Sequence, residues 1–328
     1  MKIALTGDVM LGRLVNDCLM HKPPSYPWGN TLPLIREADF ALVNLECALT
    51  SSPKMWTRTP KVFFFKADPN VGVRVLKAAG INCVNLANNH VLDYEEEGLR
   101  ETLETLERAG IAWCGAGRDL REASRPAIVS AAGLRVAVIG ATDNEPIWLA
   151  GTQQPGVNYM EFNRDNVTLL QPAINEARGQ ADLVILSLHW GPNMRQRPTR
   201  EFVEFAYGAL DSGIDVIHGH SAHIFQGVEV RNGKPIIYDA GDFIDDYAVD
   251  PFLRNDRGLL IMLEVEGRAP NAVGVYPTLI SEFQANLAEE PDYGEIVSRM
   301  RMLSGEMGTE LTEESGRLTA VIRQPISS

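Results

Sequence analysis

Five of the six histidines lie in three short segments, and each segment follows an apolar run that is typical of a buried strand. The first segment ends in His90, the second begins with His189, and the third holds His218, His220 and His223. In open α/β sheets, ligands bind at the carboxyl ends of the strands. Neutral imidazole is also the commonest metal ligand among side chains. The sequence therefore predicts a metal site assembled from several strand-end loops.

The composition limits the classes of partner. The chain has 328 residues, of which 45% are hydrophobic, so it can bury a substantial core. Its net charge of −13 at pH 7 argues against nucleic acid as a partner, because such binding depends on a basic surface. Charge of this sign also disfavours attachment to anionic lipid. A small anionic substrate can still bind where metal ions supply the local positive charge.

The cysteines and the apolar runs indicate where in the cell the protein is expected to be. Cys18, Cys47, Cys83 and Cys114 form no closely spaced pair, and we expect free thiols, with Cys83 and Cys114 buried in strands. The apolar runs are shorter than the roughly 20 residues that a membrane span needs. The first strand begins at Lys2, which leaves no room for a signal peptide. We therefore expect a cytoplasmic protein with no membrane anchor in this chain; its oligomeric state is left open.

Strand and helix patterns alternate along the first half of the chain. They predict one α/β domain whose sheet is parallel in the early part of the chain and antiparallel in the late part. Predicted strands lie at 2–6, 40–44, 81–86, 111–114, 127–130, 135–140, 183–188, 214–217, 228–230, 236–238, 259–265 and 273–280. Predicted helices lie at 32–37, 69–79, 95–109, 163–178, 199–212 and 293–303. The segments 51–61 and 142–159 are expected to be loops, and the end of the chain irregular.

Two carboxylates extend the strand-end pattern. Asp8 follows the first strand and Glu46 follows the second. Carboxylates and imidazoles suit Zn²⁺, Mn²⁺ or iron, and two metals bridged by one carboxylate form an efficient hydrolytic site. An aspartate after a first strand is often only a helix cap. The order and shared placement of these residues, rather than any one of them, predict the site.

Six motifs between residues 7 and 243 carry a family resemblance. They are Gly7–Arg13, Asn44–Glu46, Ala87–Tyr94, His189–Gly191, Gly219–His223 and Tyr238–Phe243. In this order they resemble the CapA-type proteins associated with poly-γ-glutamate capsule synthesis, a branch of the calcineurin-like metallophosphoesterase superfamily. The resemblance implies an α/β fold, a four-layer αββα sandwich with mixed parallel and antiparallel sheets. It also implies a family domain over 1–285 and a helical extension over 286–328 packed on the same domain.

The resemblance further implies a dinuclear centre of two divalent ions (Mn, Fe or Zn). Carried over by position, the implied metal ligands are Asp8 and His223 for the first ion, Glu46 as the bridge, and Asn89, His189 and His220 for the second ion. The implied catalytic residues are His90, as the general acid that protonates the leaving group, and Asp93, which orients His90.

Two departures from the family pattern leave alternatives open. Phosphoesterases usually carry a histidine two residues after the first aspartate, and here that position is Met10. The first ion thereby loses a nitrogen ligand. We expect it to be bound more weakly, to exchange more readily, or to be a harder ion. The late cluster has one extra residue between its histidines, so the ligands can be any two of His218, His220 and His223. His218 can instead support a ligand through a hydrogen bond.

Four residues are candidates for substrate binding: Arg13, Trp190, His218 and Asp242. Arg13 can clamp a phosphate or carboxylate, although a loop arginine is more often solvated. Trp190 can form a platform, but a structural tryptophan is about as frequent. Asp242, Asp245 and Asp246 form an acidic patch, for which a solvated loop is the default interpretation.

Three functions remain. The first is a metal-dependent hydrolase that uses a metal-bound hydroxide at the dinuclear centre, with a phosphoester as the expected substrate. The second is hydrolysis of a γ-glutamyl amide by the same groups. The third is a non-catalytic accessory role in poly-γ-glutamate or capsule synthesis. The Asn89-His90 pair favours chemistry over scaffolding. The expected partner is a small anionic substrate or a γ-glutamyl polymer.

Overall fold

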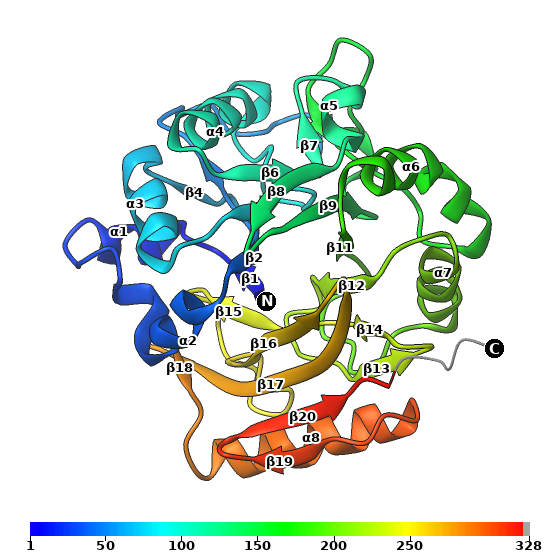
Figure 1. Cartoon of the computed structure of the whole chain (residues 1–328). Coiled ribbons are helices and arrows are strands. Elements are labelled where there is room, and N and C mark those ends of the chain that lie inside the picture. Colours follow the sequence, from blue (N-terminus) through cyan, green and yellow to red (C-terminus); the bar gives the residue numbers. More distant parts are fainter. Residues whose placement is uncertain (324–328) are drawn as a thin grey trace.

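The computed structural model describes residues 1–323 and contains two large β-sheets with helices around them (Figure 1). The larger sheet has ten strands; in spatial order they are β19 (Thr312–Glu314), β20 (Arg317–Val321), β17 (Ala269–Ser281), β16 (Arg257–Glu266), β1 (Lys2–Val9), β2 (Phe40–Leu45), β5 (Cys83–Asn85) and β6 (Ala112–Cys114), with β15 (Asp242–Ile244) beside β1 and β18 (Gln284–Leu287) beside β17. The six-stranded sheet runs β13 (Val228–Arg231), β14 (Lys234–Ile237), β12 (Val216–His220), β11 (Leu183–His189), β9 (Leu134–Thr142) and β8 (Ala127–Ala131).

Helices cover the outer faces of both sheets. Those on the larger sheet are α1 (Arg13–Leu19), α2 (Leu32–Glu37), α3 (Pro69–Ala79) and α4 (Glu95–Ala109). Those on the six-stranded sheet are the 3₁₀ helix η3 (Arg164–Leu170), α6 (Gln171–Gln180) and α7 (Arg200–Asp211). The remaining helix of comparable length, α8 (Asp292–Glu306), packs against the core between the sheets. The shorter elements are η1 (Tyr26–Thr31), β3 (Ala48–Leu49), β4 (Lys66–Ala67), β7 (Ala116–Gly117), α5 (Leu120–Ser124), η2 (Pro146–Trp148) and β10 (Gly156–Val157).

Alternation along the strands divides the core into layers. Ile3 and Leu5 point between the two sheets, whereas Ala4 faces the helices on the larger sheet. On β11, Ile185 likewise points inward and Val184 packs beneath the outer helices. Strands covered on both faces become nearly continuous apolar runs, which is why the sequence shows them clearly. The result is the four-layer αββα sandwich with mixed sheets that the resemblance implied.

Local signals define several helix ends where they were predicted. The Asp68 side chain accepts hydrogen bonds from the backbone N–H groups of Asn70 and Val71 and caps α3. Gly80, with φ of 75°, ends α3, and Gly110, with φ of 70°, ends α4. Both glycines take a left-handed conformation that a side chain would strain.

Some predicted elements differ from the structure. The end of the chain is not irregular over 312–321, because β19 and β20 form a hairpin whose second strand pairs with β17. Its turn consists of Ser315 and Gly316, both with positive φ, while β19 is exposed and polar and lacks alternation. The single helix expected at 163–178 is two helices, η3 and α6, because Pro172 stands in the first turn of α6. The helix α1 was not predicted.

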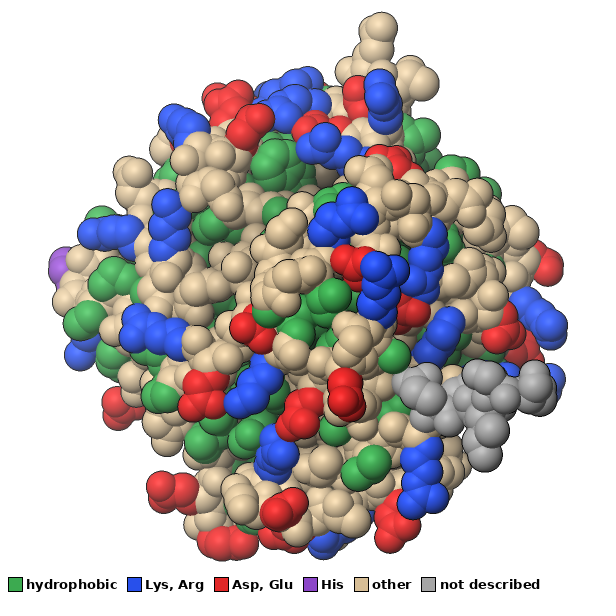
Figure 2. Space-filling model, in the orientation of Figure 1, with side chains coloured by type: hydrophobic (Ala, Val, Ile, Leu, Met, Phe, Trp, Pro, Cys, Tyr) green, Lys and Arg blue, Asp and Glu red, His purple; other side chains and the backbone are tan. Residues whose placement is uncertain are grey.

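The surface carries charged side chains of both signs. On the face shown in Figure 2, acidic and basic side chains are interspersed, without a continuous basic stripe. The four cysteines are free thiols, and Cys83 and Cys114 are buried as expected. Among the helices of residues 1–323, none combines the length and the apolar character that crossing a membrane demands.

Candidate metal centre

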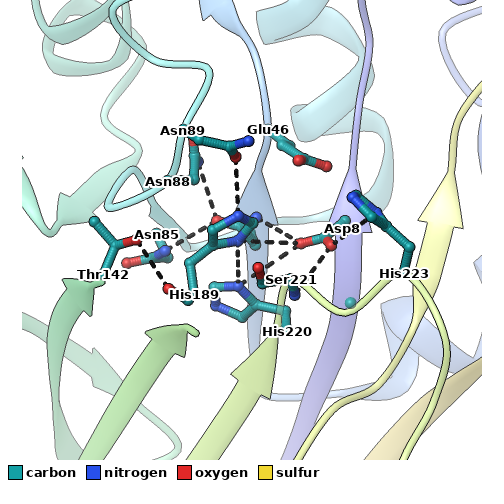
Figure 3. Close-up of polar contacts among 12 residues, drawn as sticks. Asp8, Glu46, Asn85, Asn88, Asn89, Thr142, His189, His220, Ser221 and His223 are labelled. Carbon is teal, nitrogen blue, oxygen red and sulfur yellow. Dashed lines mark hydrogen bonds and ion pairs between the residues drawn. The ribbon is translucent and has the colours of Figure 1, made fainter. Parts of the chain in front are cut away.

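Strand register brings the predicted side chains to one edge of both sheets (Figure 3). In the larger sheet, Asp8 on β1 lies opposite Asn44 on β2 and Asp242 on β15. In the six-stranded sheet, His189 at the end of β11 lies opposite His220 at the end of β12. Because β1, β2, β11 and β12 run in parallel pairs, their carboxyl ends meet at this edge.

One group of candidate ligands is rich in nitrogen and consists of Asp8, His189 and His220. The Nδ1 atoms of the two imidazoles each lie 3.7 Å from Asp8 Oδ1 and 3.0 Å from each other. Asn44 donates a hydrogen bond of 2.6 Å to Asp8 Oδ1 and so orients the carboxylate. Burial lowers the pKa of both histidines well below the usual range, which keeps them in the neutral form that binds metal.

The other group is rich in oxygen and consists of Asp8, Glu46, His223 and Asp242, with ligand atoms within 4.8 Å of one another. His223 Nδ1 lies 2.8 Å from Asp242 Oδ1 and 3.8 Å from Asp8 Oδ2. The structure thus places Asp8 in both groups, whereas Glu46, the predicted bridge, belongs to this group alone. Asp242, a candidate for substrate binding, stands among the possible ligands.

Met10 does not contribute to either group. Its side chain is buried in the core beneath the helices of the larger sheet, and its sulfur accepts a hydrogen bond of 3.0 Å from the Gly12 backbone N–H. The oxygen-rich group therefore contains one imidazole, that of His223, and three carboxylates. Such a group suits a harder ion than the nitrogen-rich group does.

The carboxylates show why a cation fits here. Glu46 and Asp242 are fully buried, and within residues 1–323 no hydrogen-bond partner reaches Glu46 Oε1 or Asp242 Oδ2. Burial raises the pKa of Asp8 to about 6, and raises the pKa of Glu46 and of Asp242 well above the usual range. Neighbouring carboxylates raise them further. Buried carboxylates with free oxygens favour a bound cation, which offsets their mutual repulsion.

Asn89 lies on the opposite side of the His189 ring. Its Oδ1 is 3.0 Å from His189 Nε2, whereas Asp8 and His220 approach Nδ1. Asn89, His189 and His220, the three ligands predicted for one ion, are therefore brought together, but not around the same nitrogen of His189. Binding of one ion by all three requires the imidazole ring of His189 to turn.

His90 and Asp93 form a buried pair beside these groups. His90 Nδ1 lies 2.6 Å from Asp93 Oδ2, and His90 Nε2 points toward Glu46 Oε1 at 3.8 Å. The Phe65 ring stacks on the imidazole at 3.9 Å, and its backbone N–H donates to Asp93. Lys61 Nζ lies 3.2 Å from Asp93 Oδ1. These contacts hold the His90 ring with one nitrogen toward the candidate ligands.

A cavity of about 520 Å³ opens beside the site and is lined by both basic and aromatic side chains. His90, His223 and Asn89 line it from the site, and Arg13 lines it from the start of α1. The Arg13 guanidinium pairs with Asp246 at 2.9 Å. Its position is therefore defined, and it is only partly exposed. The cavity provides a place for a substrate next to the candidate ligands.

Trp190 and His218 do not line this cavity. Trp190 is buried, donates a hydrogen bond of 2.8 Å to the Tyr238 carbonyl oxygen and stacks on Tyr238 and Phe202. Its position favours the structural alternative over a substrate platform. His218 is fully buried between the sheets, where its Nε2 lies 2.7 Å from the Thr6 carbonyl oxygen.

The acidic patch is not a solvated loop. Asp245 is buried, and the Asp246 side chain is fully enclosed in its pair with Arg13. Asp242 is buried among the candidate ligands. The local sequence is typical of a polar, exposed loop, but Arg13 and Leu14 at the start of α1 bind Asp246 and help to cover it.

Several residues near the site carried no prediction of their own. Asn44 and Ser221 donate hydrogen bonds to the Asp8 carboxylate. Ser221 follows the predicted ligand His220, and Asn44 stands two positions before Glu46, so their places in the motifs could have indicated them. Tyr247, which donates to Glu46 Oε2 at 3.3 Å, and Lys61 are brought in by loops. For these two, no local pattern distinguishes them from ordinary loop residues.

The sandwich brings carboxylates and imidazoles together at the strand ends of its two sheets, which is the arrangement that the family resemblance implied. Residues 2–247 match the model of one family, and the chain belongs to that family, described as bacterial capsule synthesis protein PGA_cap.

Two relatives show how far the similarity extends. A probable polyglutamine synthesis accessory protein of Mycobacterium tuberculosis is 28% identical, over 98% of this chain and 95% of the relative. The capsule biosynthesis protein CapA of Bacillus anthracis is 28% identical, over 85% of this chain and 67% of the relative. Among solved structures, a 5′-nucleotidase from Candida albicans matches with a TM-score of 0.48 at 12% identity, over 94% of this chain and 57% of the other.

Proposed function

We propose that this protein is a metal-dependent hydrolase that binds two divalent ions, of Mn, Fe or Zn, and cleaves a phosphoester. The observation that carries the proposal is the place of Asp8, which belongs to both groups of candidate ligands beside an open cavity. Divalent ions held there would neutralise charge on the substrate oxygens and activate a water molecule. The proposed ligands are Asp8, Glu46, Asn89, His189, His220, His223 and Asp242.

His90 is proposed as the proton donor to the leaving group. Burial raises the pKa of Asp93 to about 8, so the Asp93 carboxyl keeps a proton at neutral pH and shares it with His90 Nδ1. The proton of the neutral imidazole then lies on Nε2, the nitrogen that points toward Glu46 and the candidate ligands. As Nε2 gives up this proton, Asp93 can return one to Nδ1.

The proposed substrate is small and anionic. Arg13 lines the cavity, and its pair with Asp246 holds the guanidinium in place while 34% of the side chain stays exposed. A phosphate or carboxylate can accept hydrogen bonds from the remaining N–H groups. The aromatic rings of Phe63 and Phe65 lie beneath the guanidinium and leave an apolar wall for the rest of the substrate.

The test begins with metal content. Purified protein incubated with Mn²⁺, Fe²⁺ or Zn²⁺ and then desalted should retain metal at near-stoichiometric levels. The loaded protein should then hydrolyse a member of a panel of phosphomonoesters and phosphodiesters, and the chelated protein should not. Absence of bound metal under all three conditions would refute the proposal.

A second function is favoured by the names of the two relatives, which refer to polyglutamine and capsule synthesis rather than to hydrolysis. In that case the same cavity binds a γ-glutamyl polymer, either to cleave its amide or as an accessory protein without turnover. The panel therefore includes γ-glutamyl peptides. Cleavage of these peptides alone would identify the amide hydrolase. Binding of the peptides by metal-loaded protein, with no turnover of any substrate, would identify the accessory role.

A further inference from the structure

A series of buried hydrogen bonds connects β1 with the candidate ligand His220. His218 Nε2 lies 2.7 Å from the backbone carbonyl oxygen of Thr6, and its Nδ1 lies 3.1 Å from Ser187 Oγ. The same Oγ lies 3.0 Å from His220 Nε2. Thr6 and the three side-chain partners are at most 1% exposed, so water does not compete for these bonds. The proposed function gives Ser187 and His218 no role.

The Thr6 carbonyl oxygen determines the direction of every hydrogen bond in this series. A carbonyl oxygen only accepts, so the proton of His218 lies on Nε2. The His218 ring is fully buried and its two hydrogen-bond partners, a carbonyl and a hydroxyl, carry no charge, so the ring is neutral and Nδ1 is an acceptor. Ser187 has a single hydroxyl proton, and it donates that proton to Nδ1 of His218. The oxygen of Ser187 therefore accepts a hydrogen bond from His220 Nε2.

These hydrogen bonds determine which nitrogen of His220 can bind a metal ion. A neutral imidazole that carries its proton on Nε2 has its lone pair on Nδ1. In His220 this Nδ1 is the atom that lies 3.7 Å from Asp8 Oδ1 and 3.0 Å from His189 Nδ1 (Figure 3). The lone pair thus points into the nitrogen-rich group. His189 Nε2 faces the acceptor Asn89 Oδ1, so His189 also has its lone pair on Nδ1, and an ion between the two Nδ1 atoms would satisfy both lone pairs.

We propose that Ser187 and His218 are positioning residues that hold His220 in the tautomer able to bind metal through Nδ1. The inference rests on the proposed function, because it takes the nitrogen-rich group as an ion site. Imidazole ligands commonly donate their remote N–H to an oxygen acceptor, and loss of that acceptor lowers metal affinity by about 10–100-fold. Here the acceptor is itself oriented by His218, and His218 by the backbone of the strand that carries Asp8.

The first experiment reads the tautomer directly in metal-free protein. Nitrogen NMR of ¹⁵N-histidine-labelled wild-type protein should show His220 protonated on Nε2 and unprotonated on Nδ1, and His218 the same. In Ser187→Ala, His220 should lose this single tautomer and show a mixture. A proton on Nδ1 of His220 in the wild-type protein would overturn the inference, whether or not the protein binds metal.

The second experiment measures metal affinity by competition with a chelator. Ser187→Ala should bind the ion of the nitrogen-rich group about 10–100-fold more weakly, while Ser187→Thr, which keeps the hydroxyl, should remain near the wild-type value. Ser304→Ala is the matched control. Ser304 lies on α8 and is as buried as Ser187, and its Oγ accepts a hydrogen bond of 3.0 Å from the Val228 backbone N–H.

The outcomes separate the two proposals. Equal weakening in Ser187→Ala and Ser304→Ala would mean that lost stability, not the tautomer, lowers the affinity, and would overturn the inference. Wild-type protein that takes up no metal would refute the proposed function, and the NMR result alone would then decide whether the tautomer of His220 is fixed.

Discussion

The buried carboxyl groups should make the free energy of unfolding of the metal-free protein fall as pH rises. Burial raises the pKa of Glu46 and of Asp242 well above the values in an unfolded chain. Such a group keeps its proton in the folded state at pH values where the unfolded chain has lost it. Its contribution to stability is therefore complete below the unfolded pKa and is lost as pH rises through the folded pKa.

The buried histidines act with the opposite sign, but at lower pH. Burial lowers the pKa of His218 to about 4, so its stabilising contribution is present above the usual value of 6.5 and is lost only as pH falls toward 4. Asp8, with a pKa of about 6, has also lost most of its proton by pH 6.5. Between about pH 6.5 and about pH 8.5 the remaining contribution comes from four carboxyl groups whose pKa is raised by burial: Glu46, Asp242, Asp93 with a pKa of about 8 and Asp239 with a pKa of about 7.

Each carboxyl group that is protonated only in the folded state lowers the free energy of unfolding by about 1.4 kcal/mol per pH unit. With Glu46, Asp242 and Asp93 in this condition and Asp239 partly so, the steepest slope is about 4–5 kcal/mol per pH unit. Bound divalent ions favour the ionised carboxylates of Glu46 and Asp242 in the folded state, so the part of the slope due to these two groups should disappear in metal-loaded protein. Glu46→Gln should lower the slope of metal-free protein by about 1.4 kcal/mol per pH unit.

Urea denaturation, followed by circular dichroism at steps of about half a pH unit, measures this dependence. One series contains a chelator and the other contains saturating Mn²⁺. A free energy of unfolding that stays level or increases with pH in the chelated series would refute the reasoning, because it would mean that Glu46 and Asp242 are ionised without cost in the folded protein.

Four substitutions test other parts of the site. His90→Ala should keep its metal, by elemental analysis, and lower kcat roughly 10²–10⁴-fold, with a smaller loss for an aryl phosphate whose leaving group needs no proton. Asn89→Ala should lose metal together with activity; full metal content in this variant would exclude Asn89 as a ligand. Trp190→Phe should lower the free energy of unfolding by about 1–3 kcal/mol, since the Tyr238 carbonyl loses its donor, and leave metal affinity unchanged in a chelator competition. Gly219→Ala should lower both thermal stability and metal affinity, because its Cβ would lie 2.0 Å from the Tyr238 oxygen.

Local patterns in the sequence were sufficient for much of the fold. The helices α3 and α4 begin and end where they were predicted, because Asp68, Gly80 and Gly110 act within a few residues of the chain. The strand-end histidines were also visible, because each follows a run of residues buried on both faces. The hairpin at 312–321 was missed because its strands are short and β19 is exposed.

The composition of the two ligand groups depends on contacts that no local pattern contains. Asp242 reaches Asp8 because β15 pairs with the end of β1, and this pairing joins segments far apart in the chain. The connection from Thr6 through His218 to Ser187 crosses from one sheet to the other. Motif order predicted which residues gather at this edge, but tertiary geometry decides which oxygen and nitrogen atoms face each other.

The position of β1 in the larger sheet also sets the order in which the protein can be assembled during synthesis. Lys2–Val9 leaves the ribosome long before Arg257–Glu266, the strand with which it pairs on one side. Until then the strand that carries Asp8 has an open edge, which other nascent chains can pair with. The strand that carries Asp8 is therefore enclosed only after β16 has been made. A metal site that includes Asp8 would accordingly be complete only when this late strand has closed the sheet.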